Sequence, residues 1–238
     1  MPVAIVTGAS RGLGRATARA LVQRGWTLVL DARGAADLQA VVEELSPLAV
    51  SDQQAVVGLA GDVADAHHRD ELVRRATELG ELSLLINNAS VLGPSPQPTL
   101  AEYPLDVLDD VYRVNVVAPL ALIQRALPAL RAHHGTIVDV TSDAAVEGYE
   151  GWGGYGSSKA ALEQLTNVLA AEEPTLRVHR FDPGDMRTRM HQEAFPGEDI
   201  SDRPEPEDEA VPALFHLIEA ELPSGRYRIS DLREEVRS

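Results

Sequence analysis

The sequence has no cysteine, a single lysine and no long apolar run, and these shortages exclude several classes of protein. Without cysteine the chain forms no disulfide and performs no thiolate chemistry, which is compatible with a reducing compartment. No apolar run approaches the roughly 18 residues that a transmembrane helix needs. The first residues enter a predicted strand directly, without the pattern of a signal peptide. We therefore expect a cytoplasmic protein with no membrane segment.

Basic residues are scarce as a group. The chain has 21 Lys and Arg against 37 Asp and Glu, which gives a formal net charge of −16. Nucleic acids and anionic membranes are bound through basic surfaces, so we expect neither as a partner. With 238 residues, 44% of them hydrophobic, the chain is long enough for one sizeable core. We expect a single domain over residues 1–238.

The only lysine, Lys159, follows Tyr155 by four residues within the small-residue stretch 153–162. On a helix this spacing places both side chains on one face, about one turn apart. A tyrosine titrates at about pH 10 in water, and a neighbouring ammonium favours the phenolate and lowers that pKa. Tyr155 could then act as a general acid or base. The pair could also be an ordinary surface pair on an amphipathic helix.

Short apolar runs alternate with helical patterns along the chain. Strands are predicted at 3–7, 27–30, 55–59, 82–86, 136–141, 177–181 and 227–229. Helices are predicted after Gly8, at about 35–46, 64–79, 105–132 and 211–222, and from Tyr155 onward. The apolar runs are nearly continuous, as in parallel strands covered on both faces. The pattern predicts an α/β fold, a Rossmann-type doubly wound parallel sheet of about seven strands with helices on both faces.

A glycine-rich turn, Thr7-Gly8-Ala9-Ser10-Arg11-Gly12-Leu13-Gly14, connects the first strand to the first helix. Glycines allow a pyrophosphate to approach the helix N-terminus, where free N–H groups and the helix dipole attract anions. The turn could also be a tight connection without a ligand. Ligands of such sheets collect at the carboxyl ends of the strands. The other polar or glycine positions that follow predicted strands are Asp31 to Arg33, Asp62, Asn88, Ser142 and Gly184.

Taken in order, these motifs resemble the short-chain dehydrogenase/reductase family, in its compact single-domain branch. The motifs are Thr7-Gly8-x-x-x-Gly12-x-Gly14, Asp62-Val63, Asn87-Asn88-Ala89, Asn115, Ser142, Tyr155-x-x-x-Lys159, and Pro183-Gly184 with Thr188. The resemblance implies an NAD(P)-dependent oxidoreductase that interconverts a carbonyl and a secondary alcohol by hydride transfer, with a small molecule as substrate and no metal.

The same resemblance implies roles for individual residues. Ser142 would hydrogen-bond the substrate oxygen and Tyr155 would exchange the proton with it. Lys159 would hold the nicotinamide ribose and lower the pKa of Tyr155, while Asn115 would hold a water chain behind the lysine. The cofactor-binding residues would be Thr7, Gly8, Ser10, Arg11, Gly12, Leu13, Gly14, Asp31, Ala32, Arg33, Asp62, Val63, Asn88, Ala89, Ser90, Tyr155, Lys159, Pro183, Gly184, Met186 and Thr188.

Several of these residues could instead have a purely structural role. Asn115 could satisfy a neighbouring loop, and Ser142 could cap a strand end. Asp62 could cap the helix that follows instead of meeting the adenine amino group. Thr188 could be a loop hydroxyl instead of a contact of the nicotinamide carboxamide. Ser90 stands where the family usually has glycine, and the chain lacks the family's common glycine-rich C-terminal finish.

The choice of cofactor depends on the end of the second strand. An acidic residue there binds the ribose 2′-hydroxyl of NAD, whereas arginine attracts the 2′-phosphate of NADP. Counting from Gly25 places Ala32 at the discriminating position, followed by Arg33, and Arg11 lies in the glycine turn. We predict NADP(H), with NAD(H) possible, since a shift of one residue would put Asp31 in that position.

The substrate pocket is predicted to lie between residues 92–100, residues 143–152 and the segment after Gly184. Tyr149 and Trp152 could stack on a flat or apolar substrate, or could simply pack an ordered loop. Residues 185–208 show little regular pattern and are predicted to form a lid.

Two other functions make different demands on the sequence. A catalytically silent dinucleotide-sensing regulator or scaffold should have lost the catalytic residues, and Asn115, Ser142, Tyr155 and Lys159 are all present. Sugar-nucleotide epimerases of the extended branch have a differently spaced glycine turn and a larger C-terminal region. Two of the predicted helices, 105–132 and 155–171, resemble the helices through which members of the family form homodimers and homotetramers. The resemblance therefore implies a homodimer or a homotetramer.

Overall fold

A computed structural model describes residues 1–235, and its centre is one parallel sheet of seven strands in the order β3-β2-β1-β4-β5-β6-β7. The strands are β1 (Pro2–Val6), β2 (Thr27–Ala32), β3 (Val56–Ala60), β4 (Glu81–Asn87), β5 (Thr136–Val140), β6 (Arg177–Asp182) and β7 (Gly225–Arg228). The order reverses direction between β1 and β4, which creates a switch point at the carboxyl ends of these two strands. The predicted doubly wound parallel sheet is confirmed.

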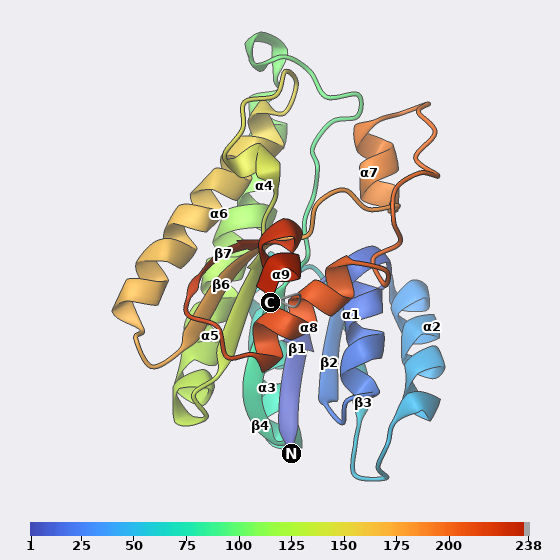
Figure 1. Cartoon of the computed structure of the whole chain (residues 1–238), viewed down its shortest axis with the longest axis vertical. Helices are drawn as coiled ribbons and strands as arrows, with labels where there is room; N and C mark the ends of the chain where they lie inside the picture. Colours follow the sequence, from blue (N-terminus) through green and yellow to red (C-terminus); the bar gives the residue numbers. More distant parts are fainter. Residues whose placement is uncertain (236–238) are drawn as a thin grey trace.

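Helices cover both faces of this sheet (Figure 1). They are α1 (Gly12–Val22), α2 (Ala35–Leu45), α3 (Ala66–Leu79), α4 (Leu105–Tyr112), α5 (Ala118–Ala132), α6 (Gly153–Glu172), α7 (Arg189–Ala194), α8 (Ala210–Glu219) and α9 (Ile229–Glu235). One apolar core joins the sheet to α1, α2 and α8, and a second joins the opposite face to α3, α5 and α6. Alternate residues of β1 show the division, because Ala4 and Val6 belong to the first core and Val3 and Ile5 to the second.

The predicted helix at 105–132 is interrupted. A π-helical turn, Arg113–Val117, separates α4 from α5. Pro119 has no N–H to donate to the carbonyl of Asn115 four residues earlier, so a regular α-helical hydrogen bond cannot form there. Such turns occur often at functional sites. Asn115 lies inside this one.

The C-terminal third also differs from the prediction. The segment 185–208 contains the short helix α7, which begins where the Thr188 hydroxyl accepts a hydrogen bond from His191 N. The last strand ends at Arg228 and continues directly into α9, whereas the sequence pattern predicts a strand up to residue 229. In Figure 1, α7 stands at the same end of the molecule as α4, beyond the carboxyl ends of the strands.

Within residues 1–235, no helix combines the length and the apolar character that crossing a bilayer requires.

His179 is a buried polar residue in the middle of β6. It has no exposed surface, and within residues 1–235 neither ring nitrogen has a hydrogen-bond partner. Burial, followed by the nearby charge of Arg177, lowers the pKa of His179 to about 4. Because the unfolded chain takes up this proton near pH 6.5, the unfolded state binds more protons than the folded state between about pH 6.5 and about pH 4.

The free energy of unfolding should therefore fall as the pH is lowered through that interval, with a contribution from His179 of up to about 3 kcal/mol. Replacing His179 with leucine should flatten this decline, as measured by urea unfolding at about pH 7 and about pH 5. The matched control is His133→Gln, at an exposed histidine, which should keep the wild-type dependence. An unchanged decline in His179→Leu would contradict the assignment.

Candidate active site

A cleft of about 970 Å³ opens at the carboxyl ends of the strands. It brings together Ser142, Tyr155 and Lys159 with most of the predicted cofactor residues. Those that line it are Gly8, Ser10, Arg11, Gly12, Leu13, Asp31, Ala32, Arg33, Asp62, Val63, Asn88, Ala89, Ser90, Pro183, Gly184, Met186 and Thr188. Segments far apart in the sequence therefore meet in one concave site.

Three predicted residues lie behind the cleft wall. Thr7 is buried, and its hydroxyl accepts hydrogen bonds from Asn88 N and Ala89 N, both at 3.0 Å, so it joins the ends of β1 and β4. Gly14 is a packing position, because a Cβ there would lie 2.4 Å from Gly8 O. Asn115 is also fully buried. These residues shape the site without lining it.

The N-terminus of α1 faces this cleft through the glycine turn. Gly8 and Gly12 adopt positive φ angles of 65° and 52°, a region that favours glycine. The N-cap position, Arg11, makes no side-chain capping hydrogen bond, and the first turn contains no acidic residue. The first-turn N–H groups of the helix are therefore not capped by the Arg11 side chain, which suits an anion.

At the end of β2, Asp31 and Arg33 lie in different environments. The Asp31 carboxylate is 2% exposed; one oxygen lies 2.6 Å from Nε2 of His68, and the other accepts a hydrogen bond from Gly8 N at 3.4 Å. Arg33 is exposed along the cleft, and Ala32 lies between them. Asp31 is thus engaged within the protein, and nothing in the sequence pattern pointed to His68 as its partner.

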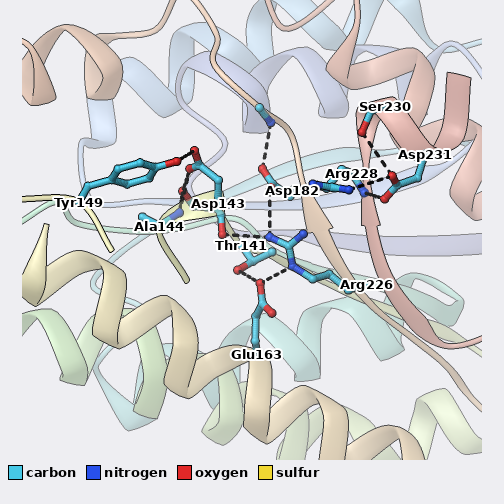
Figure 2. Close-up of polar contacts among 12 residues, drawn as sticks. Thr141, Asp143, Ala144, Tyr149, Glu163, Asp182, Arg226, Arg228, Ser230 and Asp231 are labelled. Carbon is cyan, nitrogen blue, oxygen red and sulfur yellow. Dashed lines mark hydrogen bonds and ion pairs between the residues drawn. The ribbon is translucent and has the colours of Figure 1, made fainter. Parts of the chain in front are cut away.

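Ser142 follows β5 and begins a short turn. Its Oγ donates a hydrogen bond to Asp143 Oδ1 at 2.9 Å and accepts one from Ala144 N at 3.2 Å. The other oxygen of Asp143 accepts from the Tyr149 hydroxyl at 3.0 Å, as Figure 2 shows. Asp143 lies within the predicted pocket segment, but its bond to the serine hydroxyl was not predicted.

Tyr155 and Lys159 lie one turn apart near the start of α6, as their spacing predicts. Both are buried, with 8% and 2% of their surface exposed, and the Lys159 Nζ lies 5.6 Å from the centroid of the Tyr155 ring. Lys159 Nζ donates a hydrogen bond to Val140 O at 2.8 Å. Tyr155 and Lys159 are therefore not an ordinary surface pair on an amphipathic helix.

The pKa of Tyr155 is raised in this structure, whereas the spacing alone predicts that Lys159 lowers it. Burial raises the pKa of Tyr155 well above its usual value, and the charges of Asp182 and Asp143 add to this increase, while the neighbouring Ser90 side chain acts to lower it. Burial also lowers the pKa of Lys159 to about 8, against the charges of Asp139 and Glu163. The physical reason is that removing both groups from water penalises their charged forms.

Asn115 binds the loop that follows β4. Its amide nitrogen donates to Val91 O at 2.9 Å and to Ser158 Oγ at 3.0 Å. Its amide oxygen accepts from Val91 N at 2.9 Å and from Ser90 Oγ at 3.1 Å. The side chain therefore satisfies a neighbouring loop, which is the structural role considered for it above, and connects that loop to α6.

The local hydrogen bonds also show what Asp62 and Thr188 do. Asp65, and not Asp62, caps α3, since its carboxylate accepts from His67 N and His68 N. Asp62 instead accepts from Ala64 N at 2.9 Å and lines the cleft. Thr188 caps α7 and also lines the cleft, so a structural role and a cofactor contact are compatible for this residue.

Trp152 packs within an aromatic cluster at the end of the cleft that holds Tyr155. Its ring lies 5.8 Å from the ring of Tyr155, 5.8 Å from that of Phe195 and 6.5 Å from that of Tyr149. Phe195 follows α7, and the Ser95 hydroxyl donates to Glu193 O at 2.6 Å. The predicted lid, residues 185–208, thus contacts both other segments of the predicted substrate pocket, residues 92–100 and 143–152.

The sequence model of the short chain dehydrogenases matches residues 2–199. Sepiapterin reductase of Meriones unguiculatus is 36% identical over 201 residues, which cover 80% of this chain and 76% of that protein. The chain belongs to the short-chain dehydrogenase family and is an oxidoreductase of that family.

Solved structures of the same family share the fold over nearly the whole chain. A short chain dehydrogenase from Shigella flexneri, complexed with NADP, is 28% identical with a TM-score of 0.87, covering 96% of this chain and 97% of that one. An alcohol dehydrogenase from Thermococcus sibiricus, complexed with 5-hydroxy-NADP, is 27% identical with a TM-score of 0.84, covering 96% and 95%.

Proposed function

We propose that this protein is an NADP(H)-dependent oxidoreductase that interconverts a carbonyl and a secondary alcohol, with Tyr155 as the general acid and base. The observation that carries the proposal is that Ser142, Tyr155 and Lys159 line the same cleft as the glycine turn. When bound, the dinucleotide supplies the hydride. The protein has to bind it, orient the substrate and move a proton.

The residues of the cleft fit a dinucleotide. The uncapped N-terminus of α1 suits a pyrophosphate, and Gly8 and Gly12 of the turn line the cleft in front of it. A Cβ on Gly8 would come within 2.8 Å of Ala89 Cα, so this close passage requires glycine. Asp62 and Val63 would hold the adenine end, and Pro183, Gly184 and Thr188 the nicotinamide end.

The protonated state of the Tyr155 phenol at neutral pH is the one that carbonyl reduction needs. A phenol that stays protonated at neutral pH can donate its proton to the alkoxide that forms when a carbonyl carbon accepts hydride. The Ser142 hydroxyl would turn from Asp143 to the same oxygen and stabilise its charge. The pKa of Lys159 is about 8, so most protein molecules carry a protonated Lys159 at neutral pH. This positive charge would offset the negative charge that develops on Tyr155.

Two arginines support the preference for NADP(H). Arg11 and Arg33 both line the cleft, and neither pairs with a carboxylate among the side chains that the structure describes. Asp31, the residue that would favour NAD, is nearly buried and paired with His68. A 2′-phosphate would therefore meet unpaired guanidinium groups, which bind phosphate well.

For the substrate, we propose a carbonyl compound with an apolar or aromatic group. Leu92, Ala144 and Tyr155 form a small apolar cluster at this end of the cleft, against which Trp152 and Met190 pack. We propose that residues 185–208, within a single domain of 238 residues, close over this region as a lid.

The test is a panel of aldehydes, aryl ketones, α-diketones and 2-keto acids with NADPH, and of the matching alcohols with NADP. Nicotinamide absorbance reports turnover. Reduction of at least one carbonyl class at neutral pH is expected. NADPH binding without turnover of any compound would contradict the proposal and favour a dinucleotide-sensing protein. The cytoplasmic location and the homodimer or homotetramer stay predictions.

A further inference from the structure

Arg226 of β7 lies at the centre of a polar cluster behind the reactive end of the cleft (Figure 2). Its Nε donates to Glu163 Oε1 at 2.9 Å, and its Nη2 donates to Asp182 Oδ2 at 3.0 Å. Nη2 also donates to the main-chain oxygen of Ser142 at 3.2 Å. One guanidinium therefore connects β7 to three separate segments.

Each of these segments carries a residue of the proposed reaction. Ser142 is bound directly through its carbonyl oxygen. Glu163 follows Lys159 by one turn of α6 and also accepts from the Thr141 hydroxyl at 2.7 Å. Asp182 precedes Pro183, and its second oxygen accepts from Gly184 N at 3.1 Å. A displacement of Arg226 would thus reach β5, α6 and the end of β6 together.

The cluster also balances charge. The side chains of Glu163 and Asp182 are 12% and 5% exposed, and that of Arg226 is 20% exposed. Two nearly buried carboxylates therefore share a single guanidinium. Removing one partner of a buried ion pair leaves the other charge uncompensated in a medium of low polarity.

Those two carboxylates act on the reactive pair. After burial, which has the largest effect on both groups, Asp182 and Asp143 act to raise the pKa of Tyr155, and Ser90 acts to lower it. Asp139 and Glu163 act to raise the pKa of Lys159. Arg226 contacts one carboxylate of each set, Asp182 and Glu163.

We propose that Arg226 is a positioning residue of this active site, which fixes the main chain at Ser142 and neutralises Glu163 and Asp182 beside Tyr155 and Lys159. The inference rests on the proposed function. It makes the last strand of the sheet part of the catalytic apparatus, although none of its residues lines the cleft.

The test compares Arg226→Gln and Arg226→Lys with the matched control Arg228→Gln. Arg228 lies two residues further along β7, and its exposed side chain pairs with Asp231 at 3.5 Å. The first readout is kcat, KM and the pH profile, measured with NADPH and the carbonyl of the panel that is reduced fastest. The second is the alkaline tyrosinate absorbance of each protein minus that of its Tyr155→Phe counterpart, which isolates the Tyr155 phenol without turnover.

Arg226→Gln should lower kcat about tenfold, with little change in KM for NADPH, because Ser142 loses its anchor. Both the pH profile and the Tyr155 titration should move to higher pH by about half a unit or more, since Asp182 and Glu163 lose their counter-charge. Arg226→Lys keeps the charge but not the planar fork, so its pH profile should stay near the wild type while kcat falls several-fold. Arg228→Gln should match the wild type throughout.

A folded Arg226→Gln protein whose kcat and pH profile equal those of Arg228→Gln would overturn the inference. If Arg226→Gln does not fold, a wild-type kcat in Arg226→Lys would overturn it. If the wild-type protein reduces no carbonyl, the proposed function fails separately. The Tyr155 titration then still decides whether Arg226 controls the charge of this site.

Discussion

Replacing Tyr155 with phenylalanine should abolish carbonyl reduction and leave NADPH binding nearly unchanged. In the proposed function the buried phenol of Tyr155 donates the proton, and its aromatic ring also packs against Trp152, so phenylalanine removes the hydroxyl and keeps the packing. General acid catalysis by one side chain typically contributes about 10²- to 10⁴-fold, so kcat should fall within that range. The measurement is steady-state NADPH oxidation with the best carbonyl of the panel, together with an NADPH titration of Trp fluorescence.

The matched control is Tyr112→Phe, at the end of α4, because this half-buried tyrosine does not line the cleft. It should keep wild-type kcat and KM. A Tyr155→Phe protein with more than about a third of the wild-type kcat would exclude Tyr155 as the proton donor and shift attention to Ser142 or a bound water.

Arg33→Ala should weaken NADPH binding by about 10- to 100-fold and leave NADH binding nearly unchanged. Hydrogen bonds between charged groups contribute about 1.5–3 kcal/mol, and each 1.4 kcal/mol corresponds to a tenfold change in affinity. Adding Ala32→Asp should reverse the preference, because a carboxylate there repels a 2′-phosphate and accepts a bond from a 2′-hydroxyl. Parallel titrations with NADPH and NADH measure both effects.

Arg15→Ala is the control for this experiment. Arg15 lies in the first turn of α1, close to the glycine turn, but it pairs with Glu44 and does not line the cleft. It should alter neither affinity. Tighter binding of NADH than of NADPH by the wild-type protein would contradict the assignment of Arg33 and indicate that Asp31 leaves His68 to bind the ribose.

The fold and most of the cleft could be predicted because their signals are local or periodic. Continuous apolar runs bounded by turn residues mark each strand, and the alternation of strand and helix fixes a parallel sheet. Residues placed just after strands then meet at one edge, which is why Gly8, Asp62 and Ser142 could be assigned to one site. The π-helical turn was missed, although Pro119 gives a local signal for it.

Other features depend on contacts between distant segments. Asp31 and Ala32 are neighbours in the sequence, but only the packing of His68 against β2 shows which one is engaged within the protein. Similarly, Arg226 is 63 residues from Glu163 and 44 from Asp182, so no sequence pattern links them.

The sequence alone determined that Tyr155 and Lys159 share one helix face, because the geometry of a helical turn is a property of the backbone. Only the tertiary structure decided the direction in which the pKa of Tyr155 moves. The pKa of a tyrosine in water, corrected for one nearby cation, predicts a decrease. Burial of the Tyr155 side chain instead raises its pKa. Desolvation depends on everything packed around a group, and that information is absent from the spacing of two residues.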